Sequence, residues 1–145
     1  MSRNHILNLQ RLNSMSQIQT LHQQAMDLAE AAAVARLRGA SEQAAQLTRQ
    51  AFEQETQAAN LIASVLDAEP TRSVLHRSAA SLAIECGELR VAEHLIATAL
   101  SGNPPPEIAE ELKDLFIEIN LSQYLKRQGI NYPRIKSLRG RIIHH

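Results

Sequence analysis

Residues Thr71–Pro106 read TRSVLHRSAASLAIECGELRVAEHLIATALSGNPPP, and this segment predicts two helices joined by a tight turn. Apolar side chains recur at steps of three and four on both sides of Gly87, which is the spacing of one buried helix face. Gly87 stands where the first helix has to end, because glycine adopts a left-handed backbone at little steric cost. Pro104, Pro105 and Pro106 end the second helix. We therefore expect an antiparallel helical hairpin that buries both apolar faces.

The small residues of this hairpin follow a second pattern. Ala80, Gly87, Ala92, Ala99 and Pro104 stand at offsets of 7, 5, 7 and 5 residues. This spacing resembles the small-residue skeleton of a tetratricopeptide repeat (TPR), a helix-turn-helix unit of about 34 residues. Small side chains at these points let two helices cross closely. The large aromatic residues that the family usually has in its first helix are absent here, with His76 and Ala83 in their places.

The same skeleton occurs upstream. Ala32, Gly39, Ala44 and Ala51 repeat the offsets 7, 5 and 7, but Gly39 and Gly87 are 48 residues apart. The resemblance therefore implies two TPR-like hairpins with an irregular spacing, and two such units need a cap to bury their last apolar face.

Periodic apolar residues predict the remaining helices. We expect them over about residues 17–38, 42–66 and 107–127, with Ser41 as the N-cap of the second. The helix over 107–127 has an acidic start and a basic end, which complement the helix dipole. The expected fold is all-α with about five helices: antiparallel hairpins stacked as a short TPR-like right-handed α-solenoid with a C-terminal capping helix.

This organisation divides the chain into three parts. We expect a flexible, polar N-terminal lead-in over residues 1–16, a TPR-like helical domain over 17–127 and a basic C-terminal tail over 128–145. Resemblance to the family covers roughly residues 25–106.

Composition agrees with a helical core. Of the 145 residues 44% are apolar, yet the chain has only two Phe, two Tyr and no Trp, so Ala, Leu and Ile must fill the interior. The single cysteine, Cys86, excludes an internal disulfide and is typical of a reducing compartment. We find neither an apolar run of roughly 18 residues nor a signal peptide, so we expect a soluble, cytoplasmic protein without membrane contact.

The net charge of zero conceals an asymmetry. Residues 1–118 contain nine basic and all fifteen acidic residues, a net charge of −6, whereas residues 119–145 contain six basic residues and no acidic ones. This basic tail is a candidate for nucleic-acid binding through phosphate contacts. The favoured interpretation is a solvated terminus, or an arm that folds over acidic helices of the same or a neighbouring chain. Its basic residues are Lys126, Arg127, Arg134, Lys136, Arg139 and Arg141.

Catalytic and metal-binding motifs are absent from the sequence. It has no His-Glu-x-x-His, no phosphate-binding glycine loop and no Gly-x-Ser-x-Gly. A site built from Cys86, Glu85, His76 and His94 is conceivable, but a buried structural role for Cys86 is favoured. We expect no enzymatic activity, no metal and no cofactor.

The resemblance implies a function in protein–protein interaction. In TPR proteins the first helix of each hairpin lines a concave groove that holds a peptide or helix, as in an adaptor or regulatory subunit. Two arginines among the matching positions suggest an acidic partner. The alternative function is a nucleic-acid-associated regulator acting through the basic tail, and a homo-oligomeric scaffold is a third. The groove residues implied by the resemblance are Met26, Ala29, Ala33, Arg36, Leu37, Val74, Arg77, Ser81, Ile84 and Glu85.

Overall fold

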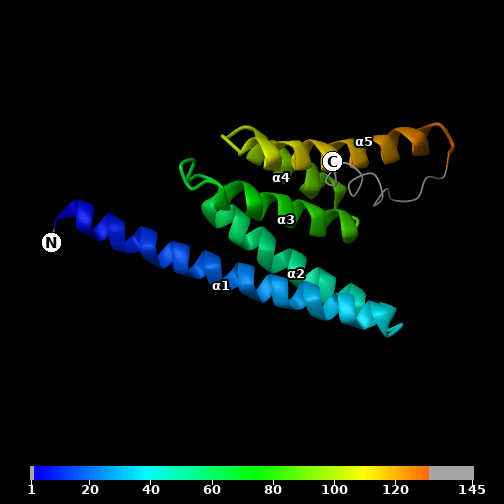
Figure 1. Cartoon of the computed structure of the whole chain (residues 1–145), viewed down its shortest axis with the longest axis horizontal. Coiled ribbons are helices and arrows are strands. Elements are labelled where there is room, and N and C mark those ends of the chain that lie inside the picture. The colour runs from blue at the N-terminus through cyan, green and yellow to red at the C-terminus, as the bar shows by residue number, and fades with distance from the viewer. Residues whose placement is uncertain (1, 131–145) are drawn as a thin grey trace.

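The computed structural model describes residues 2–130, which form five α-helices and no strand. Figure 1 shows a long α1–α2 hairpin, with α3 packed against α2 and the α4 and α5 helices beyond it. The prediction of an all-α stack of helical hairpins with five helices is confirmed. The helices are α1 (Arg3–Leu37), α2 (Ser41–Ile62), α3 (Thr71–Glu85), α4 (Leu89–Leu100) and α5 (Pro106–Arg127).

Both hairpins turn through the same glycine motif. Gly39 and Gly87 have φ angles of 77° and 76°, the left-handed conformation expected of them. After α1 the Ala40 N–H donates to the Ala35 carbonyl at 2.9 Å, which is the closing hydrogen bond of a Schellman motif. Ala40 is therefore also the N-cap of α2, and the prediction that Ser41 caps this helix is wrong. The turn is so tight that Ser41 already belongs to the helix.

The alanines of the small-residue skeleton lie at the helix crossings. None of them is more than 2% exposed, so the backbones of each hairpin approach one another without a large side chain between them. These alanines are Ala32, Ala44, Ala51, Ala80, Ala92 and Ala99.

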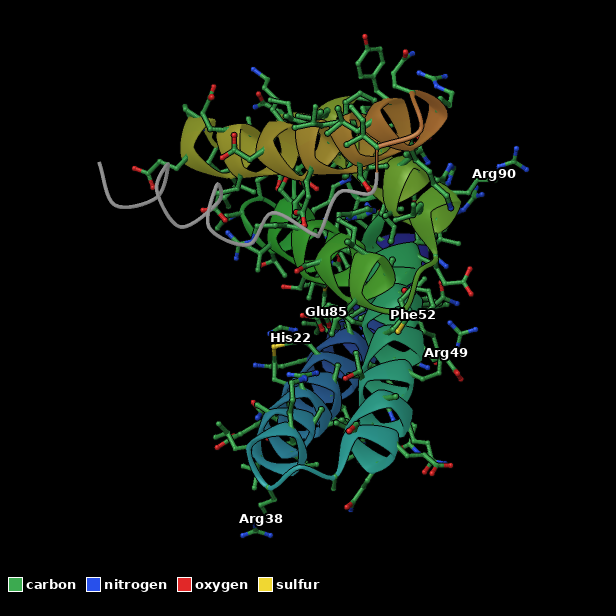
Figure 2. The ribbon with its side chains drawn as sticks, turned by 90° about the vertical axis from the view of Figure 1, so that its right-hand side faces the viewer. His22, Arg38, Arg49, Phe52, Glu85 and Arg90 are labelled. Atoms are coloured by element: carbon green, nitrogen blue, oxygen red, sulfur yellow. The ribbon has the colours of Figure 1, made fainter. Side chains whose placement is uncertain are left out.

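α1 begins much earlier than expected. We expected a start at about Gln17, but the helix begins at Arg3, with the Ser2 hydroxyl accepting a hydrogen bond from the His5 N–H. Residues 3–14 contain no proline or glycine that would stop a helix, and all of them are exposed. Figure 1 shows this part of α1 projecting beyond the other helices. At the opposite end the α1–α2 hairpin extends past α3, with Arg38 at its tip (Figure 2).

Two buried polar residues, Arg72 and Glu55, hold helices together. The sequence patterns did not single out either of them. Arg72, 2% exposed, donates from Nε to the Ala63 carbonyl at 2.8 Å and from Nη2 to the Thr98 carbonyl at 3.0 Å. Its guanidinium thereby joins the carboxyl ends of α2 and α4, where helix dipoles favour a cation. Glu55 on α2 is fully buried, and both its carboxylate oxygens lie within 3.0 Å of His22 Nδ1 on α1.

Two apolar residues within the expected helices 42–66 and 107–127 lie outside the core. Phe116 is 43% exposed and Leu66 is 61% exposed. The neighbour of Phe116 on α5, Leu115, is 1% exposed. α2 ends at Ile62 instead of reaching Leu66, which consequently lies in the irregular connection to α3.

Candidate functional site

A groove of about 350 Å³ runs along α3, between α1 and α5. We call it the α3 groove. Three helices that are far apart in sequence contribute to it, and it contains apolar, hydroxyl and charged side chains. Its lining residues are Met26, Arg77, Ser78, Ser81, Leu82, Glu111 and Leu115.

Apolar side chains form the base of the α3 groove. Leu82 and Leu115 are 8% and 1% exposed, and Met26 is half-buried above them. The α3 residues that line it are 77, 78, 81 and 82, which helical periodicity places on one face. The base can therefore accept apolar side chains of a peptide.

An ion pair crosses one end of the α3 groove. Arg77 Nη1 donates to Glu111 Oε2 at 2.8 Å, and both side chains are about 30% exposed. The pair ties α3 to α5. It also neutralises Arg77, so this arginine is already matched with a carboxylate of its own chain.

Four carboxylates lie on one face of α5, and one of them, Glu111, lines the α3 groove. Glu107, Glu111, Asp114 and Glu118 follow one another at offsets of 4, 3 and 4 residues, which places them on one face of α5. We call them the acidic stripe. Glu118 is only 5% exposed, and Asp114 Oδ2 is buried without a hydrogen-bond partner. Burial and the neighbouring Glu110 and Glu111 carboxylates raise the pKa of Asp114, as expected where negative charges are crowded.

Only some of the ten groove residues implied by the TPR resemblance lie together in the structure. Met26, Arg77 and Ser81 line the α3 groove. Arg36 and Glu85 line a different cavity, and Val74 lines a third with residues at the start of α3. The rest are scattered: Ala29 is half-buried, Ile84 is buried, and Ala33 and Leu37 are exposed.

The sequence analysis missed the contribution of α5. Glu111 and Leu115 stand 34 residues after Arg77 and Ser81, one repeat period further along the chain. Treating the capping helix as a third repeat would have found both. Ser78 and Leu82 were missed because they flank the matched positions on the same face of α3.

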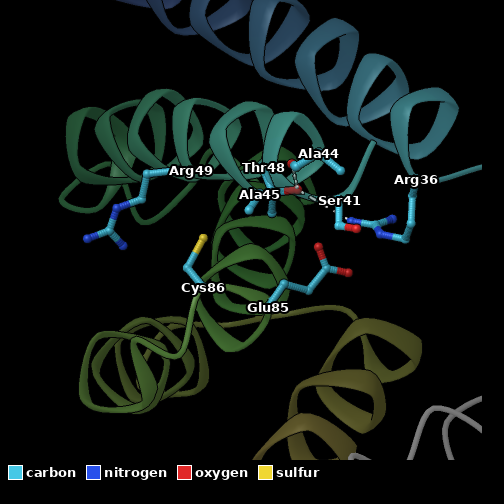
Figure 3. Close-up of a pocket in the computed structure, with 8 residues that line it drawn as sticks. All are labelled: Arg36, Ser41, Ala44, Ala45, Thr48, Arg49, Glu85 and Cys86. Atoms are coloured by element: carbon cyan, nitrogen blue, oxygen red, sulfur yellow. Dashed lines mark hydrogen bonds between the residues drawn. The ribbon is translucent and has the colours of Figure 1, made fainter. Parts of the chain in front are cut away.

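The second cavity, about 640 Å³, lies between the tip of the first hairpin and the end of α3 (Figure 3). Arg36 Nη2 donates to Thr48 Oγ1 at 3.5 Å, and Figure 3 shows Arg36 and Glu85 directed into the same space.

Cys86 also lines this cavity. Burial raises the pKa of its thiol, although Arg49 opposes this shift. Cys86 is therefore less easily ionised than a free cysteine.

Metal-binding side chains are not gathered at any point within residues 2–130, where no group of three or more such residues occurs. His76, considered above with Cys86, is 1% exposed, and its Nδ1 lies 2.7 Å from the Arg72 carbonyl oxygen. It therefore donates to the backbone of its own helix.

Four of the six basic-tail residues lie outside the described residues: Arg134, Lys136, Arg139 and Arg141. Lys126 and Arg127 are exposed in the last turn of α5.

These features define an all-α stack of helical hairpins with a groove that combines an apolar base and an ion pair at one end, next to the acidic stripe of α5. No family model matches the chain, and neither a curated protein nor a solved structure matches it. Within residues 2–130, no helix combines the length and apolar character that crossing a membrane requires.

Proposed function

We propose that this chain is a non-enzymatic protein–protein interaction module, an adaptor or regulatory subunit, which binds a peptide or helix of a partner protein in the α3 groove. The observation that carries the proposal is the groove itself, an apolar base beside an acidic stripe, lined from three helices. Such a surface suits an amphipathic segment, whose apolar side chains enter the base while its charged ones meet the stripe.

The TPR-like character is part of this proposal. Arg77 and Glu111 are separated by 34 residues and pair directly, as equivalent positions of adjacent repeats would. The buried alanines at the hairpin crossings support the same interpretation. The cytoplasmic location that we propose rests on Cys86 being the single cysteine of the chain.

The partner segment that fits this groove is basic. We first inferred an acidic partner from Arg36 and Arg77. However, Arg77 is paired with Glu111, and Arg36 lines the second cavity. Carboxylates of the acidic stripe then set the charge of the α3 groove, so a peptide with Lys or Arg beside apolar residues is complementary to it.

Blocking the groove tests the proposal. In Ser81→Arg a long cationic side chain fills the groove and repels a basic peptide. Ala97→Arg is the matched control, because Ala97 is exposed on α4, away from the groove. We expect affinity capture from a lysate of the source organism to recover a defined protein with the wild type and with Ala97→Arg, but not with Ser81→Arg. Equal capture by both variants, with unchanged circular dichroism, would show that the partner binds elsewhere.

A further inference from the structure

We propose that residues 131–145 of the chain's own basic tail bind along the acidic stripe into the α3 groove and compete there with the partner segment. This inference rests on the proposed function and extends it to regulation. Residues 131–145 lie outside the described residues, so the groove and the sequence carry the inference.

The first reason is charge complementarity. Residues 131–145 contain four cationic side chains, Arg134, Lys136, Arg139 and Arg141, and no carboxylate side chain. The acidic stripe has four carboxylates, of which Glu111 pairs with Arg77. Such an arrangement attracts the one strongly cationic segment of the sequence.

The second reason is that apolar side chains of the tail match the apolar base of the α3 groove. Ile135, Leu138, Ile142 and Ile143 alternate with the cations of the tail. The base of the α3 groove offers Leu82, Leu115 and Met26. The tail therefore has the amphipathic character that we assign to the partner segment.

The third reason is that the chain leaves the end of α5 at a point from which the tail can reach the acidic stripe. Gly129, with a φ angle of 78°, and Ile130 close a Schellman motif, in which their N–H groups donate to Lys126 and Leu125 at 3.1 and 2.9 Å. This motif turns the chain out of the helix direction. Glu118 lies nine residues before Arg127, which is about 14 Å along the helix. Fifteen extended residues span up to about 50 Å, so the tail reaches the whole stripe.

Tethering makes even a weak contact effective. A segment joined by a short linker acts at an effective concentration in the millimolar range. A tail that binds with a dissociation constant of about 0.1 mM would then occupy the groove most of the time and weaken a competing peptide about tenfold.

A zero-length carbodiimide cross-link tests the position of the tail in the full chain. This reagent joins a lysine amine to a carboxylate in direct contact, and Lys136 is the single lysine of residues 131–145. We expect mass spectrometry to find Lys136 joined to Asp114 or Glu118 within one chain, with the cross-link suppressed by high salt. A mixture of isotopically light and heavy chains separates intrachain from interchain products.

Internal controls are available for this measurement. Lys113 Nζ lies 3.6 Å from Glu110 Oε1 on the outer face of α5, so this cross-link should form in every sample. Glu118→Gln should reduce the Lys136 cross-links, whereas Glu53→Gln on α2 should not. Lys136 joined as often to Glu53 and Glu110 as to the acidic stripe would overturn the proposal.

Competition is measured with a labelled peptide of the sequence INYPRIKSLRGRIIHH. We compare the wild-type chain with a full-length variant in which Arg134, Lys136, Arg139 and Arg141 are all replaced by Gln. We expect the peptide to bind the variant about tenfold more tightly, and Ser81→Arg in the same background to abolish this binding. Equal affinity for wild type and variant would overturn the inference.

The outcomes separate this inference from the proposed function. If the tail peptide binds neither chain while Ser81→Arg still abolishes partner capture, the inference fails and the interaction module remains. If Ser81→Arg changes neither measurement, both fail. A duplex DNA probe that binds wild type and not the Gln variant, without Lys136 cross-links to the stripe, would overturn the inference in favour of nucleic-acid binding by the tail.

Discussion

Arg72 shows how one side chain can fix the arrangement of three helices. It lies in the first turn of α3, and its guanidinium donates to carbonyls at the carboxyl ends of α2 and α4. A Cβ at Gly102, two residues after the end of α4, would collide with Arg72 Nη1 and force the guanidinium to move. The buried charge is tolerated because it meets the negative ends of two helices.

We expect Arg72→Met to destabilise the protein by about 3 kcal/mol, because it removes the hydrogen bonds that join the Ala63 and Thr98 carbonyls while keeping most of the volume. The Thr98 carbonyl keeps a second donor, Ser101 Oγ at 2.8 Å, whereas the Ala63 carbonyl loses its side-chain donor. Urea unfolding followed by circular dichroism measures this change. Arg90→Met is the control, since Arg90 is exposed and Figure 2 shows it pointing away from the helices. A loss equal to that of the control, within about 0.5 kcal/mol, would contradict the bridging role.

His76 makes stability depend on pH. Burial lowers its pKa, since the charged imidazolium is poorly solvated inside the protein. The folded-state pKa lies below the unfolded value of about 6.5, so the associated stability is present above pH 6.5 and is lost as the pH falls through the folded-state pKa.

His76→Asn keeps a donor for the Arg72 carbonyl and removes the titration. We expect the free energy of unfolding to fall less steeply below pH 6.5 in this variant than in the wild type. Glu55 gives stability the opposite dependence on pH, because burial raises the pKa of its carboxyl group. Its contribution to the free energy of unfolding is present below pH 4.5 and is lost as the pH rises through the folded-state pKa. Both proteins contain Glu55, so its effect cancels when the wild-type and His76→Asn curves are compared. Parallel curves of unfolding free energy against pH would show that His76 does not cause the pH dependence.

At the scale of the helix, α5 has one face in the core and one in solvent. Leu112, Leu115 and Ile119 are almost fully buried, and Phe116 and Ile117 are 43% and 50% exposed. Sequence periodicity alone does not distinguish Phe116 from the core residues, because the apolar residues of α5 extend around more than half of the helix. Contacts with α3 and α4 decide which of these residues are buried.

Adjacent substitutions test this division. Leu115→Ala should cost about 2 to 5 kcal/mol through lost burial and a residual cavity. Phe116→Gln should change the free energy of unfolding by no more than about 0.5 kcal/mol. Both are measured by urea unfolding, and a Phe116 effect as large as that of Leu115 would place this face of α5 in an interface.

For the whole molecule, continuity of the core predicts cooperative unfolding. One cluster of buried apolar residues extends from Ile18 on α1 to Ile119 on α5, through all five helices. We therefore expect hydrogen exchange in increasing urea to give α2 and α5 amides the same free energy of opening. Opening of the α1–α2 hairpin at a clearly lower free energy would instead identify two independently unfolding units.

The candidate site was only partly predictable. Met26, Arg77 and Ser81 follow from counting along a repeat, because the helical period and the turn glycines place them. The acidic stripe follows from the α5 sequence, but its position beside Arg77 does not, since α3 and α5 meet through packing between distant segments. That contact is the reason why we propose a basic instead of an acidic partner segment.

The sequence by itself determined the helices, their turns and the close crossings, because helical periodicity, positive-φ glycines and small residues act over a few neighbouring positions. Tertiary structure alone decided the rest: which arginine is paired with a carboxylate, which aromatic is exposed, and which groups Arg72 and Glu55 contact in the interior. Those outcomes depend on burial and electrostatics between residues far apart in the chain. No local pattern encodes that information.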